Sequence, residues 1–116
     1  PWKSLNHSRG AMLRGSGIGF VAGILPGAGA SLGSFLAYMV EKSVAKDKDT
    51  FGKGNVRGVA APEAGNNAAA GGALIPMLTL GVPGSGTTAV LLALLLTLNI
   101  TPAPCCSPNG PRWYGR

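Results

Sequence analysis

The sequence predicts an all-α membrane protein fragment in which a re-entrant helical hairpin is followed by a discontinuous transmembrane helix. Hydrophobic residues make up 46% of the 116 residues and charged residues only 12%, whereas soluble domains carry about 25% charged residues. The segment 15–40 contains no charged residue at all. Glycine and proline, with 19 and 9 residues, interrupt the apolar runs. Small residues at this density favour close helix packing in lipid.

The uncharged segment 15–40 is predicted to form the re-entrant hairpin. Its glycines recur at every fourth position and would share one helix face: Gly15, Gly19, Gly23 and Gly27. The run Pro26-Gly27-Ala28-Gly29 then interrupts the helix. Basic residues flank both ends of the segment. The alternative is a single kinked crossing, which would place one basic flank on the outer side of the membrane, against the positive-inside tendency. Two arms of about 15 Å whose tip turns near the bilayer midplane leave both flanks in the cytoplasm.

The polar segments on either side complete this topology. Residues 1–14 are basic and include Trp2, so they form either an interfacial segment or a frayed end of the chain. Residues 41–58 carry five positive and three negative charges with glycine breakers, which predicts a cytoplasmic loop. Residues 102–116 abandon the apolar pattern, and we expect a disordered tail with no transport role. Its adjacent cysteines lack the spacing of a zinc site.

Residues 59–101 are predicted to be a broken helix region. Two helix-capable runs, Ala73–Leu80 and Thr87–Ile100, flank the sequence GVPGSG at residues 81–86. Proline lacks a backbone donor and glycine tolerates almost any backbone angle, so the helix should stop there. The two arms and the break together cover a bilayer of about 30 Å as one discontinuous helix, with a second hairpin as the alternative.

The two breaks predict a binding site. Backbone groups freed by a break are tolerated at membrane depth only where they line a cavity or bind a ligand. A helix begins after each break, and a helix N-terminus binds anions such as a carboxylate. Freed carbonyl groups and nearby hydroxyl groups are oxygen ligands suited to Na⁺ as a coupling ion. The amides of two adjacent asparagines either contact the substrate or ion, or only cap and join helices.

The candidate substrate- or ion-binding residues share a position in or beside a break, or an amide or hydroxyl group. They are Pro26, Gly27, Ala28, Gly29, Asn66, Asn67, Thr79, Pro83, Gly84, Ser85, Gly86 and Thr87.

Other classes of function fit the sequence less well. The net charge is +6, but the basic residues form no dense run and no aromatic residues interleave with them, which argues against nucleic-acid binding. With His7 as the one histidine and no paired carboxylates, we expect no enzyme, cofactor or metal centre. Gly81 and Gly86 have the glycine spacing of a phosphate-binding P-loop, but Thr87 stands where that motif needs lysine. An accessory membrane protein would use its small residues only for packing, without prolines in the breaks.

The motifs of residues 15–101 resemble the large permease subunit of the tripartite tricarboxylate transporters. The resemblance rests on Phe51-Gly52-Lys53-Gly54, Pro62-Glu63-Ala64, Asn66-Asn67-Ala68, the run from Ile75 to Gly84, and Leu25-Pro26-Gly27-Ala28-Gly29. It implies a multi-pass carrier of the bacterial inner membrane that moves tricarboxylates or related small carboxylates, by cation symport. It also implies a small membrane subunit and a periplasmic binding protein as partners. Such carriers need more spanning segments than this chain supplies, so we expect a fragment.

Overall fold

The computed structural model describes residues 2–102, and all regular structure within this range is helical. The elements are α1 (Trp2–Ile24), α2 (Gly29–Val44), the short 3₁₀ helix η1 (Lys48–Thr50), α3 (Arg57–Leu80) and α4 (Gly86–Thr97). This confirms the all-α class. The predicted tail lies outside the described residues, apart from Pro102.

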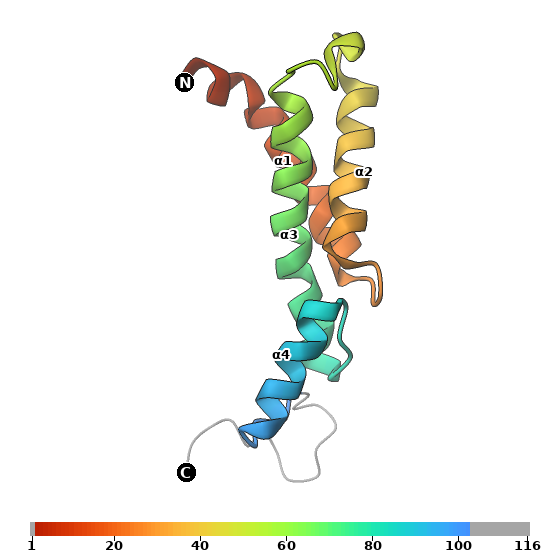
Figure 1. Cartoon of the computed structure of the whole chain (residues 1–116), viewed down its shortest axis with the longest axis vertical. Coiled ribbons are helices and arrows are strands. Elements are labelled where there is room, and N and C mark those ends of the chain that lie inside the picture. Colours follow the sequence, from red (N-terminus) through yellow and green to blue (C-terminus); the bar gives the residue numbers. More distant parts are fainter. Residues whose placement is uncertain (1, 103–116) are drawn as a thin grey trace.

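Helices α1, α2 and α3 pack against one another as a bundle, whereas α4 lies beyond its end and contacts chiefly α3 (Figure 1). The chain reverses at residues 25–28, so that α2 runs back along α1 and brings Glu41 against Arg14. Helix α3 then runs parallel to α1. Both predicted helix breaks are therefore present, and both lie at the α4 end of the bundle.

The glycine face of α1 is where α3 approaches closest. A Cβ atom at Gly15, Gly19 or Gly23 would overlap the backbone of Ala61, Gly65 or Ala69, respectively. The predicted packing face is confirmed for these three glycines. It was wrong for Gly27, because α1 ends at Ile24 and Gly27 lies in the turn with a φ of 84°.

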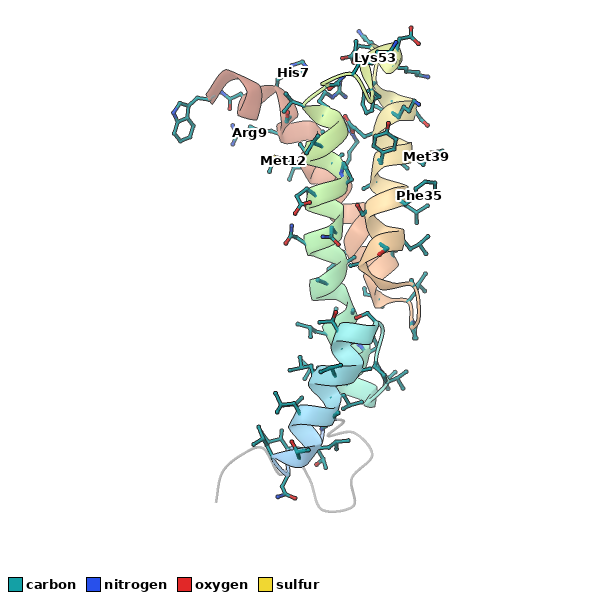
Figure 2. The ribbon with its side chains drawn as sticks, in the orientation of Figure 1. His7, Arg9, Met12, Phe35, Met39 and Lys53 are labelled. Carbon is teal, nitrogen blue, oxygen red and sulfur yellow. The ribbon has the colours of Figure 1, made fainter. Side chains whose placement is uncertain are left out.

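Small residues fill the centre of the bundle, and large apolar side chains cover its outside. Buried positions include Ala37, Ala61 and Ala69, whereas Leu13 and Val59 are 75% and 69% exposed. Phe35 and Met39 likewise project outward from α2 (Figure 2). Bundles of this kind, with small residues at the helix contacts, are typical of membrane proteins.

Helix α3 is longer than predicted. The expected arm of residues 73–80 is the last third of one helix that begins at Arg57 and contains both Pro62 and Pro76. Each proline removes a single backbone donor, and the small face of α3 packs against α1 from Ala61, next to Pro62, as far as Gly72. Among residues 2–102, no helix combines the length and the apolarity that crossing a membrane requires. The discontinuous transmembrane helix and the re-entry of the hairpin stay predictions.

The other boundaries also differ from those expected. Helix α1 continues from Trp2 without a boundary at residue 15. Helix α2 extends to Val44, beyond the expected end of the hairpin at residue 40. The connection from α2 to α3 is anchored by Phe51, which is 7% exposed and meets Tyr38 edge-on with ring centroids 5.8 Å apart.

Candidate functional site

The two helix breaks are joined by a backbone hydrogen bond. The N–H of Gly27 donates to the carbonyl oxygen of Gly84 across 3.1 Å. The first break depends on Gly27 and Gly29, whose φ values of 84° and 68° lie in the left-handed region that favours glycine. Two segments that lie 57 positions apart in the sequence, Pro26-Gly27-Ala28-Gly29 and Pro83-Gly84-Ser85-Gly86, thus meet in space.

The second break is built by a helix stop and a helix cap. Gly81 ends α3 in the left-handed region with a φ of 68°, and its N–H donates to the carbonyl oxygen of Met77 over 3.0 Å. Ser85 then caps α4. Its hydroxyl oxygen accepts from the N–H of Thr88 at 3.3 Å, while its own N–H donates to the Thr88 hydroxyl at 2.8 Å. This reciprocal capping box fixes where α4 begins.

A cavity of about 580 Å³ opens where the breaks meet. We call it the break cavity. The first turns of α2 and α4 and the second half of α3 form its walls: Gly27, Gly29, Ala30, Ser31, Ala70, Gly71, Leu74, Ser85, Gly86, Thr87, Thr88 and Leu91.

The break cavity presents two helix N-termini. The N-cap position of α2, Ala28, has no side-chain cap, so the first N–H groups of that helix are left without a side-chain acceptor. In α4 the cap occupies the N–H of Thr88 but not those of Gly86 and Thr87. The first N–H groups of a helix have no acceptor within it and carry about half a positive charge. No acidic side chain lines the cavity. The arrangement suits an anion.

The predicted site residues divide between the break cavity and other places. Five of them line it, namely Gly27, Gly29, Ser85, Gly86 and Thr87, and Gly84 adjoins it through its hydrogen bond. Thr79 is exposed, and its hydroxyl donates to the Ile75 carbonyl oxygen of its own helix at 2.7 Å. Pro26, Ala28 and Pro83 belong to the breaks but not to the cavity lining.

The two asparagines face different surroundings. The Asn67 amide donates to the Glu63 carbonyl oxygen one turn earlier, at 2.9 Å, and is exposed. Asn66 is half-buried and faces α2 across a polar groove of about 460 Å³. We call this the α2–α3 groove; it is lined by Ser31, Ser34, Phe35, Tyr38, Pro62 and Asn66.

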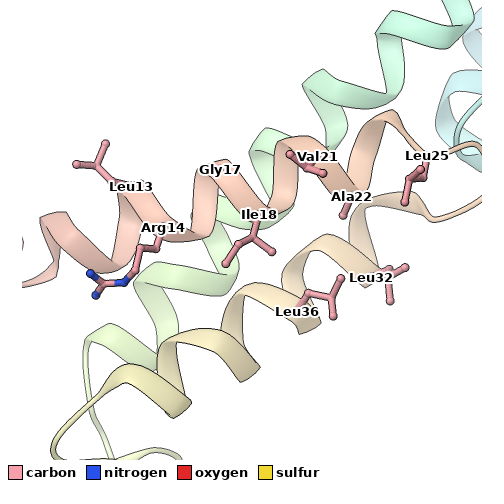
Figure 3. A pocket seen from close by; sticks show the side chains of 9 residues that line it. All are labelled: Leu13, Arg14, Gly17, Ile18, Val21, Ala22, Leu25, Leu32 and Leu36. Atoms are coloured by element: carbon pink, nitrogen blue, oxygen red, sulfur yellow. The ribbon is translucent and has the colours of Figure 1, made fainter.

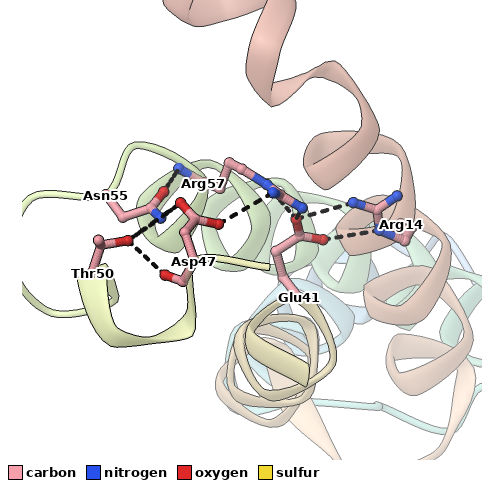
Figure 4. A network of polar contacts seen from close by, with 6 residues as sticks. All are labelled: Arg14, Glu41, Asp47, Thr50, Asn55 and Arg57. Carbon is pink, nitrogen blue, oxygen red and sulfur yellow. Dashed lines mark hydrogen bonds and ion pairs between the residues drawn. The ribbon is translucent and has the colours of Figure 1, made fainter. Parts of the chain in front are cut away.

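An ionic cluster at the opposite end of α2 was not predicted from the sequence. Glu41 is 1% exposed and accepts from the guanidinium groups of Arg14 and Arg57, with Nε–Oε distances of 2.9 and 2.8 Å (Figure 4). Burial raises the pKa of Glu41, but the hydrogen bonds and charges of Arg14 and Arg57 outweigh it and hold the pKa below its ordinary value. The partners lie 27 and 16 residues away, so no local sequence signal could have paired them.

The connection after α2 extends this cluster. Arg57 also approaches Asp47 at 3.6 Å, and the Asn55 amide donates to the Asp47 carboxylate at 2.7 Å. Hydrogen bonds from the backbone N–H of Asp47 itself, and from Thr50 and Asn55, lower the pKa of Asp47. The expected loop is therefore tied to the start of α3.

A third hollow is almost purely apolar. It measures about 550 Å³ and lies between α1 and α2, lined by Leu13, Arg14, Gly17, Ile18, Val21, Ala22, Leu25, Leu32 and Leu36 (Figure 3). It offers no polar side chain except Arg14, which is engaged with Glu41. Within residues 2–102, no three His, Cys, Asp or Glu side chains lie close enough together to hold a metal ion.

Helical breaks that meet at a cavity are a feature of membrane carriers. The alternative of a P-loop is wrong, because helix α3, and not a strand, precedes Gly81. The chain belongs to the tripartite tricarboxylate transporter TctA family, whose sequence model matches residues 1–112. This confirms the resemblance seen in the motifs.

Two relatives from Agrobacterium vitis are similar to this chain. One, an uncharacterized 52.8 kDa protein of the TAR-I ttuC′ 3′ region, is 43% identical over 95 residues, or 82% of this chain and 19% of the relative. The other, an uncharacterized protein of the TAR-II ttuC′ 3′ region, is 45% identical over 96 residues, or 83% of this chain and 40% of the relative. The chain thus spans less than half the length of these curated relatives. No solved structure matches it.

Proposed function

We propose that this chain is the part of a permease subunit that binds a carboxylate of the transported substrate at the break cavity. The observation that carries the proposal is the hydrogen bond between Gly27 and Gly84, which holds the first turns of α2 and α4 at one cavity. N–H groups at two helix starts there face a space lined by no acid, and such groups bind carboxylates without any ionisable side chain. The family supplies the substrate class, tricarboxylates or related small carboxylates.

The wider setting follows from the same family. The complete permease would lie in the bacterial inner membrane, receive substrate from a periplasmic binding protein and work with a small membrane subunit. Coupling to Na⁺ would use oxygen ligands at the breaks, among them the hydroxyl of Thr87. In this topology α1 and α2 form the re-entrant hairpin, and residues 25–28 turn within the membrane next to the second break.

A side chain that fills the break cavity tests the proposal. A Cβ at Gly71, which lines the cavity, would meet no atom within 4 Å, so the larger side chain of Gly71→Leu starts in open space beside the cavity. Leucine is also a better helix former than glycine. In the complete permease, Gly71→Leu should abolish citrate uptake into membrane vesicles while membrane insertion stays normal.

The matched control is Gly17→Leu. Gly17 is also helical with no atom within 4 Å of its Cβ position, but it lines the apolar hollow between α1 and α2. This variant should transport like the parent. If Gly71→Leu also transports like the parent, the breaks only pack helices, as an accessory membrane protein would use them.

A further inference from the structure

The uncharged polar side chains of α2, α3 and α4 fall into two sets. In the first set each side chain hydrogen-bonds within its own helix or cap: Ser43, Asn67, Thr79, Thr88 and Thr97. The second set makes no side-chain hydrogen bond to any described residue, and every member lines the break cavity or the α2–α3 groove: Ser31, Ser34, Tyr38, Asn66 and Thr87.

Helix geometry alone does not explain why the second set makes no hydrogen bonds. Serine and threonine in a helix ordinarily donate to the carbonyl oxygen three or four residues earlier, as Ser43 does to Met39 at 2.8 Å. Ser34 sits on the same helix and makes no such bond, although it is half-buried. Ser31 and Thr87 are exposed, whereas Ser34, Tyr38 and Asn66 are half-buried, and all five side chains keep hydrogen-bonding capacity for a ligand.

The two hollows are neighbours, since Ser31 lines both of them. Ser31, Ser34 and Tyr38 stand three and four residues apart and therefore share one face of α2. Ser34 lies about 5 Å farther along the helix axis than Ser31, and Tyr38 about 10 Å farther. The groove thus leads away from the helix N-termini in steps of one turn, with Asn66 of α3 facing it.

We infer that the α2–α3 groove binds a second carboxylate of the same substrate whose first carboxylate occupies the break cavity. This rests on the proposed function of that cavity. Hydroxyl and amide groups donate hydrogen bonds to carboxylate oxygens, and no acidic side chain lines the groove. A molecule with several carboxylates a few ångströms apart reaches both places, whereas a monocarboxylate reaches one. The groove therefore makes this part of the permease selective for di- and tricarboxylates.

Binding is best measured on the purified complete permease without its binding protein, because the binding protein would influence the half-saturation of uptake. The probe is protection from thermal unfolding in detergent, titrated with citrate and separately with acetate. Ser34→Ala and Asn66→Ala should each weaken citrate binding roughly tenfold or more, since each removes a hydrogen bond to a charged group. Acetate binding should not change. Ser34→Thr keeps the hydroxyl and should bind citrate like the parent.

Ser43→Ala and Asn67→Ala are the matched controls, because their groups are already bonded within their own helices. They should leave citrate binding unchanged. The inference is overturned if the groove variants bind citrate like the parent. It is also overturned if they lose stability while their citrate affinity stays intact, which would mean that another helix covers the groove. If Gly71→Leu still abolishes citrate binding in that case, the proposed function stands without the groove. A parent permease that binds no citrate overturns both.

Discussion

Glu41 and Arg57 form a buried ion pair that ties the end of α2 to the first turn of α3. The Nε of Arg57 lies 2.8 Å from Oε1 of Glu41, and Arg14 of α1 donates to both carboxylate oxygens, at 2.9 and 3.0 Å. One carboxylate therefore joins all three helices of the bundle (Figure 4). It lies near the end of α2, whereas the break cavity lies at the start of that helix. Of the residues that are essentially fully buried, Glu41 is the second largest after Met77, in a bundle otherwise packed with alanine and glycine.

Replacing this carboxylate should destabilise the bundle. Glu41→Gln removes the negative charge and leaves Arg57, whose side chain is 16% exposed, without its main partner. We expect a loss of about 3 kcal/mol in the free energy of unfolding. This value is at the lower end of the range for a broken buried pair, because the side chain of Arg14 is 41% exposed and water can solvate its charge once the carboxylate is gone. Denaturation of the detergent-solubilised protein followed by circular dichroism measures it. Asp49→Asn, an exposed acid in the same connection, should change the stability by less than about 0.5 kcal/mol.

The same carboxylate predicts a pH dependence. Because the pKa of Glu41 is lower in the folded protein than in the unfolded chain, its stabilisation is complete above the ordinary value of about 4.3 and is lost as the pH falls through the lower folded value. The parent should therefore lose stability in this acidic range, and Glu41→Gln should lose less. Parallel stability curves for the two proteins across this range would show that Glu41 is not held ionised by its arginines.

The glycine contact between α1 and α3 can be tested with a matched pair of substitutions, one at Gly19 and one at Gly17. A Cβ at Gly19 would overlap the backbone atoms of Gly65, which have no flexible end to move aside, whereas a Cβ at Gly17 meets open space. Gly19→Ala should separate the helices and cost about 1–3 kcal/mol of stability. Gly17→Ala should gain up to about 1 kcal/mol from its better helix propensity. Equal effects of the two substitutions on the unfolding midpoint would contradict the close approach of α1 and α3.

The sequence predicted the features that depend on local chemistry. Pro26-Gly27 and the run from Gly81 to Pro83 mark the breaks by missing donors and free backbone angles, so both breaks were foreseen within a few residues. The capping box of Ser85 is equally local but was not predicted. The start of α3 at Arg57, well before the expected arm of residues 73–80, was not foreseen, because it depends on packing against α1, which no short window of sequence reveals.

The residues of the two proposed binding places divide in the same way. Helix starts at the breaks were foreseen, and so was Asn66 as one of two candidate amides. The choice between Asn66 and Asn67 depends on which faces α2, and that is set by the rotation of α3 in the bundle. Ser34 and Tyr38 carried no signal of their own, since a hydroxyl in a helix usually bonds to its own backbone. Their lack of partners appears only once α2 and α3 are placed together.

The last prediction concerns the re-entrant hairpin. Both flanks of the predicted membrane segment lie at one end of the bundle, because Arg14 reaches Glu41, the residue before Lys42, at 2.9 Å. A hairpin that enters and leaves on one side needs this arrangement, and the positive-inside tendency puts that side in the cytoplasm. The test introduces Leu13→Cys and Lys42→Cys, one at a time, into a complete permease that lacks Cys105 and Cys106. Both new cysteines are at exposed positions beside the ionic cluster and leave its ion pairs intact. A membrane-impermeant maleimide should label neither cysteine in intact cells and both in inside-out vesicles, and a permeant reagent should label both in each case. If one of the two reacts from outside intact cells, the segment crosses the membrane, and the turn at residues 25–28 is a kink in a crossing helix and not the tip of a re-entrant loop.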